Sequence, residues 1–184
     1  AYLEALPQGE DRPIIPGLMW RGQEDTYCPG PRPNLEGLPF LYTAADLEEL
    51  GRKGKIVYYE SSRGCPFSCS FCGSAGEPLR ERPLERVLAE LEQLATTGGQ
   101  VKFIARTFNA RKDRACIITR KLLDLYRPGL SWHCEISPFS LPEELVSLWL
   151  EAPPHYLKLE MGVQSLSPAA LAAIGRRGDW EQAE

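Results

Sequence analysis

The chain has 184 residues, which is enough for one sizeable hydrophobic core and little more. An apolar content of 43%, a charged content of 25% and a net charge of −4 are ordinary for a globular protein and give no electrostatic footprint for general nucleic-acid binding. No apolar stretch approaches the roughly 20 residues that a membrane-spanning helix needs, so we expect no membrane insertion.

Residues 1–54 are expected to form an irregular, Pro-rich segment. Proline removes a backbone donor and fixes φ, so it interrupts helices and inner strands. Seven prolines precede residue 41: Pro7, Pro13, Pro16, Pro29, Pro31, Pro33 and Pro39. We therefore interpret residues 1–54 as a linker with short extended pieces and one helical turn at residues 43–50.

Residues 55–184 show a regular alternation of strand and helix patterns. β-Branched and aromatic runs predict strands at 55–61, 100–107, 130–138 and 155–163. Apolar residues at helical spacing predict helices at 82–99, 111–129, 141–152 and 167–177. Four strand–helix units predict an α/β fold with a parallel sheet and right-handed crossovers. Because no G-x-G-x-x-G follows a strand, we favour a partial parallel (β/α) barrel over a nucleotide-binding open sheet.

Three cysteines lie within eight residues of the loop that follows the first predicted strand. The segment "SSRGCPFSCSFCGSA" contains Cys65, Cys69 and Cys72, and it has no fourth cysteine or histidine nearby. A disulfide would leave one thiol over, and a structural zinc site needs four ligands. A four-iron four-sulfur cluster held by three thiolates would leave one iron open for a small molecule.

Zinc remains the alternative for this loop, with His133 or Cys134 as the missing ligand. We interpret His133, Cys28, Cys116 and Cys134 otherwise as structural, with His133 pointing away from the barrel interior. Reduced thiols packed into one loop favour a cytoplasmic setting over a secreted disulfide framework.

The spacing C-x-x-x-C-x-aromatic-C directly after a first strand resembles the radical S-adenosylmethionine (SAM) superfamily. Three further segments support the resemblance, namely "FIARTFN", "HCEISP" and "KLEMGVQS". The pattern over residues 55–178 is similar to the branch with cobalamin-dependent radical enzymes, methylthiotransferases and oxygen-independent coproporphyrinogen oxidases. It implies that the open iron binds SAM and that one electron cleaves SAM to a 5′-deoxyadenosyl radical.

The resemblance also implies a set of cofactor-binding residues. Phe71 would lie near the adenine, Glu135 would bind the ribose or the amino end of SAM, and Gln164 would bind the ribose hydroxyls. Thr107 and Asn109 occupy a position that many family members use for the amino group, and Glu160 would face the barrel interior. Arg176 would pair with the carboxylate. Four of them have a plainer alternative: core packing for Phe71, an ion pair with an arginine of the barrel for Glu135, and a helix-end cation for Arg176. For Glu160 the alternative is an ion pair with Lys158 or Arg106.

A family core usually has six strand–helix units, whereas four are expected here. We therefore interpret the chain as a fragment, with residues 1–54 as the possible tail of a preceding cobalamin-binding domain and 55–184 as the N-terminal part of the barrel domain. Cobalamin would then bind through a domain outside these residues. Implied partners are an unknown substrate and a one-electron donor such as a flavodoxin or ferredoxin. A non-catalytic iron–sulfur or zinc-binding module is the alternative to an enzyme.

Overall fold

A computed structural model describes residues 14–21 and 27–176. The chain divides into two compact units, Ala1–Asn34 and Leu35–Glu184. In the first unit the described residues form turns and extended chain, and the Gly17 N–H donates to the Cys28 carbonyl over 2.7 Å. The compact second unit therefore begins at Leu35 and takes in part of the segment that we expected to be linker.

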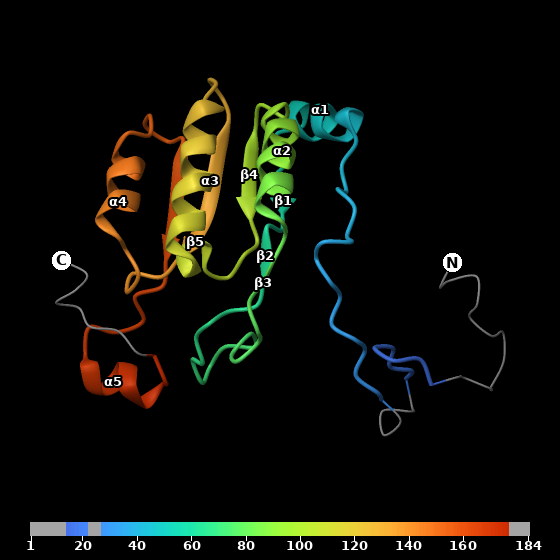
Figure 1. Cartoon of the computed structure of the whole chain (residues 1–184), viewed down its shortest axis with the longest axis vertical. Helices are drawn as coiled ribbons and strands as arrows, with labels where there is room; N and C mark the ends of the chain where they lie inside the picture. The colour runs from blue at the N-terminus through green and yellow to red at the C-terminus, as the bar shows by residue number, and fades with distance from the viewer. Residues whose placement is uncertain (1–13, 22–26, 177–184) are drawn as a thin grey trace. The chain divides into compact units, whose positions relative to one another are not determined.

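The second unit is built on a four-stranded parallel sheet in the order β1-β4-β5-β6. Its strands are β1 (Val57–Tyr59), β4 (Gln100–Phe103), β5 (Ser131–Ile136) and β6 (Leu157–Met161). Crossover helices α2 (Leu84–Ala95), α3 (Lys112–Asp124) and α4 (Glu143–Leu150) lie together on one face of the sheet (Figure 1). The predicted partial (β/α) barrel, its strand order and its four strand–helix units are confirmed.

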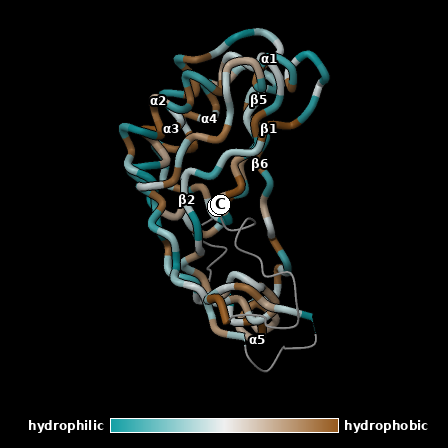
Figure 2. The backbone as a smooth tube through the Cα atoms, turned by 90° about the vertical axis from the view of Figure 1, so that its right-hand side faces the viewer, coloured by the Kyte–Doolittle hydropathy of each residue, from teal (hydrophilic) through white to brown (hydrophobic). Residues whose placement is uncertain are grey.

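Strand alternation separates a buried sheet face from a polar one. Val101, Phe103 and Trp132 are fully buried against the helices, and Phe103 makes edge-on ring contacts with its neighbours Tyr59 and Phe108. Lys102 and Glu135 alternate with these core residues and lie on the opposite face. Figure 2 shows α2, α3 and α4 together on one side of the strands. The polar face is thus the interior side of an open barrel.

Two elements were underestimated from the sequence. The expected single turn is a nine-residue helix, α1 (Ala44–Arg52), which begins with a capping box between Thr43 and Asp46. A short antiparallel pair of strands with two residues each, β2 (Ser62–Arg63) and β3 (Arg80–Glu81), was not expected at all. The cysteine loop connects these two strands, and we refer to the pair as the β2–β3 hairpin. The remaining elements are the 3-10 turn η2 (Phe108–Ala110) and α5 (Pro168–Ala173).

No helix in the described ranges has both the length and the apolar character needed to span a bilayer.

Candidate functional site

The short β2–β3 hairpin closes the base of the cysteine loop. The Cys65 N–H donates to the Glu77 carbonyl over 3.0 Å, which continues the pairing beyond the hairpin. Gly64 has φ +94°, and a Cβ at this position would lie 2.2 Å from the Pro78 carbonyl oxygen. Only glycine fits there, because both the dihedral angle and the contact exclude a side chain. The hairpin thus fixes where the loop leaves the sheet.

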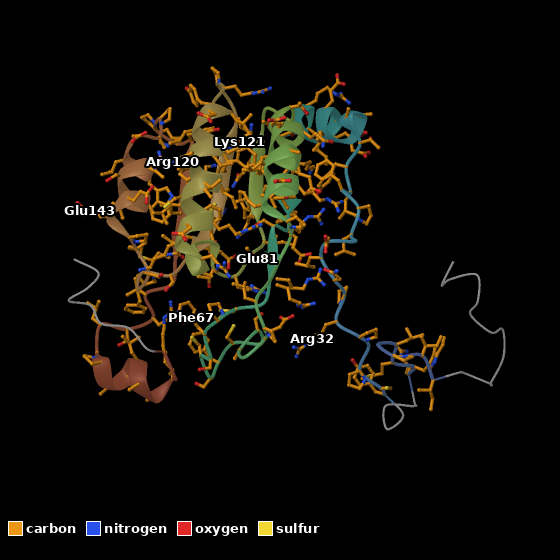
Figure 3. The ribbon with its side chains drawn as sticks, viewed as in Figure 1. Arg32, Phe67, Glu81, Arg120, Lys121 and Glu143 are labelled. Carbon is orange, nitrogen blue, oxygen red and sulfur yellow. The ribbon has the colours of Figure 1, made fainter. Side chains whose placement is uncertain are left out.

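Within the loop, tight backbone turns bring the three thiols to one cavity. The Cys72 N–H donates to the Cys69 carbonyl, and the Ala75 N–H donates to the Cys72 carbonyl, each over 3.0 Å. Cys65, Cys69 and Cys72 are free cysteines that line a cavity of about 240 Å³. The aromatic side chains of Phe67 and Phe71 line it as well. Figure 3 shows Phe67 on this loop, below the carboxyl ends of the strands.

The opposite wall comes from the carboxyl ends of β4, β5 and β6. The whole cavity is lined by six of the seven predicted cofactor-binding residues: Phe71 on the loop, and Thr107, Glu135, Glu160, Gln164 and Arg176 across from it. Parallel strands present their carboxyl ends at the same edge, which is where barrel active sites are found. The cysteine loop lies at this edge too, as expected from its position after the first strand.

Gln164 adopts a backbone conformation that is unusual for its residue type. Its φ is +65°, in the left-handed region that side chains other than Gly, Asn and Asp rarely occupy. A Cβ on Gly162 would lie only 2.8 Å from the side-chain nitrogen Nε2 of Gln164. The absence of a side chain at Gly162 therefore makes room for the Gln164 amide. Such strained residues concentrate at ligand sites.

Arg176 reaches back from the end of α5 to the same strand end. Its Nη2 donates to the Gly162 carbonyl over 2.5 Å, and its guanidinium lies 5.7 Å from the centre of the Phe139 ring. Its Nε is buried without a hydrogen-bond partner among the described residues. A buried, unpaired guanidinium N–H at a cavity wall is an available donor for an anionic ligand.

Glu135 and Glu160 face each other across β5 and β6, and Lys102 links them. The Lys102 Nζ lies 3.4 Å from Glu135 Oε1 and 3.1 Å from Glu160 Oε2. The hydrogen bond from Lys102 holds the pKa of the Glu160 carboxyl below its usual value. As the alternative, we expected Glu160 to pair with Lys158 or Arg106, but in the structure its ion-pair partners are Lys102 and His133. Both carboxylates still line the cavity.

His133 contradicts our expectation that it points away from the barrel interior. Its Nε2 lies 3.0 Å from Glu160 Oε2 on the polar face. The error was one of parity: residues two apart on a strand share a face, so His133 and Glu135 project from the same side. Strict alternation of side chains along the strand would have placed His133 on the interior face with Glu135.

Two residues after β4 have different surroundings. Thr107 is buried beside the loop, with its Oγ1 3.6 Å from the Cys65 Sγ. Asn109 does not line the cavity: it is fully buried, and its amide donates to the Ser137 and Ser140 carbonyls and accepts from the Ser137 N–H. The same role was expected for both residues, whereas Asn109 ties the turn after β4 to the turn after β5.

Some cavity residues were missed from the sequence. Phe67, Arg106 and Ser137 line the cavity but were not among the predicted site residues. Phe67 lies between the first two loop cysteines, so its place in the motif was a usable signal. Arg106 directly precedes Thr107 at the end of β4, and its proximity to a predicted site residue was a second signal.

A sequence comparison identifies the family. The family model of the radical SAM superfamily matches residues 59–184, which is more than half of the chain. The chain belongs to the radical SAM superfamily. The matched residues include the cysteine loop and the cavity walls that β4, β5 and β6 provide.

Relatives of this radical SAM chain include two kinds of transferase. An uncharacterised methyltransferase of Pyrococcus horikoshii is 29% identical over 95% of the chain. The ribosomal protein uS12 methylthiotransferase RimO of Moorella thermoacetica is 26% identical over 90% of the chain. The chain spans 39% of the length of each of these two proteins.

A solved structure supports the fold. The cobalamin-dependent SAM radical enzyme OxsB, with aqua-cobalamin and SAM bound, superposes with a TM-score of 0.62. The likeness covers 85% of this chain and 25% of the OxsB chain, at 18% sequence identity. It agrees with the partial radical SAM barrel.

Membership of the radical SAM superfamily implies a four-iron four-sulfur cluster and SAM, and the cavity residues fit both. Three free thiols line one wall, and the buried unpaired Nε of Arg176 belongs to the other. Within residues 14–21 and 27–176, no three His, Cys, Asp or Glu side chains are grouped closely enough for a single metal ion. A four-iron cluster gives each thiolate its own iron, so its ligands stand farther apart than those of one ion.

Proposed function

We propose that this chain is part of an enzyme that reductively cleaves SAM at a cluster held by Cys65, Cys69 and Cys72. The observation that carries the proposal is the single cavity shared by these thiols and by polar residues from three strand ends. When bound, the cluster supplies the electron that cleaves SAM and yields a 5′-deoxyadenosyl radical. The protein contributes binding, orientation and exclusion of water.

The polar wall suits the functional groups of SAM. Gln164 offers both a donor and an acceptor, which suits ribose hydroxyls, and the Glu135 carboxylate accepts hydrogen bonds from hydroxyls or from the ammonium group. Arg176 would bind the SAM carboxylate, because a guanidinium forms two parallel hydrogen bonds with a carboxylate. We assign Glu160 and Thr107 to the same wall. Asn109 acts instead as a positioning residue for the turns after β4 and β5.

Phe71 is proposed as the contact for adenine. Its side chain is 56% exposed although it lines the cavity, so it is not a core residue in the described structure. An exposed aromatic ring beside a polar cavity can stack on a base, and its apolar surface then leaves water.

The alternative class is a protein that holds a metal or an iron–sulfur cluster without catalysis. Anaerobic reconstitution with iron and sulfide, followed by a chemical reductant and SAM, separates the two. We expect 5′-deoxyadenosine to form in proportion to protein, and none to form with the Cys69→Ala variant. A reconstituted cluster that binds SAM but never cleaves it would reject the enzyme. Zinc bound at one ion per chain, with no iron incorporated, would favour the zinc module.

The names of the relatives favour a particular reaction class. A methyltransferase and a methylthiotransferase are among them, so we infer transfer of a methyl or methylthio group to an unidentified substrate, with oxidoreduction as the alternative. The likeness to OxsB supports cobalamin use through a domain other than the barrel units described here. The reaction needs a one-electron donor, for which a flavodoxin or ferredoxin is suitable, and a reducing cytoplasmic setting suits the free thiols.

Replacing Arg176 with lysine is expected to weaken SAM binding by about 1–3 kcal/mol, the scale of a lost charged hydrogen bond. Lysine keeps the positive charge but loses the planar fork. The measurement is SAM affinity of the reconstituted protein, followed by the change in the electron spin resonance of the reduced cluster. Iron content should stay unchanged. Glu135→Gln serves as the companion variant, and wild-type affinity in both would remove the two residues from the SAM site.

A further inference from the structure

A second cavity adjoins the SAM cavity on the inner side of the cysteine loop. Its volume is about 350 Å³, and it is lined by Glu60, Arg63, Gly64, Ser74, Glu77, Ile104, Arg106 and Glu135. Arg106 and Glu135 line both cavities. A molecule in the second cavity would therefore contact the residues that border the proposed SAM site. The proposed function does not assign this space.

Most of the charges around the second cavity are paired within the protein. Arg63 donates twice to Glu60, through Nε and Nη2, each over 2.6 Å. Arg80 Nη2 lies 2.7 Å from Glu77 Oε1. Lys102 Nζ lies 3.4 Å from Glu135 Oε1. Each carboxylate in the lining thus lies within ion-pair distance of a cation, although Glu135 shares Lys102 with Glu160.

Arg106 is the exception. It is exposed, and the part of the chain that the structure describes provides neither a carboxylate within ion-pair distance nor a hydrogen-bond acceptor for its guanidinium. Among the described cations that line the second cavity, Arg106 is therefore the one without an ion-pair partner, and it lines both cavities. An unpaired guanidinium beside a cavity attracts an oxyanion and binds it with two parallel hydrogen bonds.

We propose that the 350 Å³ cavity binds the substrate and that Arg106 binds an anionic group of it, a carboxylate or a phosphate. This rests on the proposed function, because it places the substrate next to the SAM site. Arg106 lies three residues after β4, and the cavity lining includes the apolar side chain of Ile104. The substrate class is consequently an organic anion with some apolar surface, rather than a cation or a neutral sugar.

The test uses inorganic phosphate and succinate as probes on the anaerobically reconstituted chain. Calorimetric titrations at constant ionic strength give the affinity for each probe, with and without saturating SAM. Arg106→Gln is the test variant, and Arg106→Lys keeps the charge without the fork. Arg120→Gln is the matched control, since Arg120 is an exposed arginine on α3 that pairs with Glu144 over 2.8 Å. SAM cleavage to 5′-deoxyadenosine is followed in parallel.

We expect the chain to bind at least one probe, and which probe it prefers distinguishes phosphate from carboxylate chemistry. Arg106→Gln should lower that affinity at least about tenfold, the equivalent of one lost charged hydrogen bond, while Arg120→Gln leaves it unchanged. SAM should not displace the probe.

Three results would overturn the proposal: no binding of either probe to the wild type, unchanged binding to Arg106→Gln, or displacement of the probe by SAM. The last would place the anion in the first cavity. Failure of the wild type to cleave SAM would reject the proposed function instead. This outcome is measured separately, as the formation of 5′-deoxyadenosine.

Discussion

Replacing Cys69 with alanine is expected to abolish incorporation of the iron–sulfur cluster during anaerobic reconstitution. Cys69 is the most buried of the three loop thiols, at 7% exposure, and its carbonyl accepts the hydrogen bond that turns the loop toward Cys72. Removing its sulfur leaves one iron without a protein ligand, and no other thiol lies in the loop to replace it. Iron and sulfide content of the desalted protein should fall to background.

The control for this variant is Cys116→Ala. Cys116 is also buried, but it lies on α3 and not in the cavity. It should retain the wild-type iron and sulfide content, so that any general effect of losing a buried cysteine is accounted for. Cluster assembly of wild-type extent in Cys69→Ala would show that the three-thiolate assignment is mistaken.

Replacing Arg82 with methionine is expected to lower the free energy of unfolding by about 3–5 kcal/mol, the usual loss when one partner of a buried ion pair is removed. The Arg82 and Glu90 side chains are 6% and 4% exposed, and Arg82 Nη2 lies 2.5 Å from Glu90 Oε1. The Tyr59 hydroxyl also donates to Glu90, over 2.6 Å. Burial, with Glu90 adding to the effect, holds the pKa of Tyr59 well above its usual range. The phenol therefore stays a donor.

This network links three parts of the fold. Arg82 directly follows β3, Glu90 lies on α2, and Arg82 also donates to the Leu38 carbonyl over 3.1 Å. Without Arg82, the Glu90 carboxylate keeps Arg86 and Tyr59 but loses its buried cation. The base of the cysteine loop would lose its attachment to α2.

Equilibrium unfolding in denaturant measures the effect, with Lys121→Met as the control. Lys121 and Arg120 lie on α3 in Figure 3, and Lys121 pairs with the exposed side chain of Glu92. Loss of this ion pair should lower the free energy of unfolding by less than about 1 kcal/mol, as for other surface ion pairs. The double variant Arg82→Met with Glu90→Leu should regain part of the stability, because the Glu90 carboxylate is no longer buried without its buried cation. A loss below about 1 kcal/mol in Arg82→Met would contradict the assigned role of the network.

Much of this fold follows from sequence periodicity. Strands with β-branched and aromatic residues alternate with amphipathic helices, and that alternation leads to a parallel sheet whose carboxyl ends meet at one edge. The same rule brings Glu135, Gln164 and Arg176 together from segments far apart in the chain. The motif of Cys65, Cys69 and Cys72 then locates the site at that edge.

Other features depend on contacts that periodicity does not encode. The β2–β3 hairpin has two residues per strand, too few for a pattern to repeat. An asparagine amide can bind a ligand or the backbone equally well, so Asn109 could be placed only once its partners Ser137 and Ser140 were known. The sequence likewise does not reveal that Arg106 lacks an ion-pair partner, because this depends on which cations the nearby carboxylates contact in the fold.

The end of α5 is attached to the cysteine loop, and this attachment would make the binding of the two proposed ligands, the cluster and SAM, interdependent. The Ser70 N–H donates to the Ile174 carbonyl over 2.9 Å, and a Cβ on Gly175 would meet the Ser68 carbonyl oxygen at 3.1 Å. Arg176 is the next residue, so a ligand that immobilises its guanidinium also restrains the loop. Thermodynamic linkage requires the reverse with equal strength. SAM would accordingly raise the affinity of the loop for the cluster by the same coupling free energy through which the assembled cluster raises the affinity for SAM.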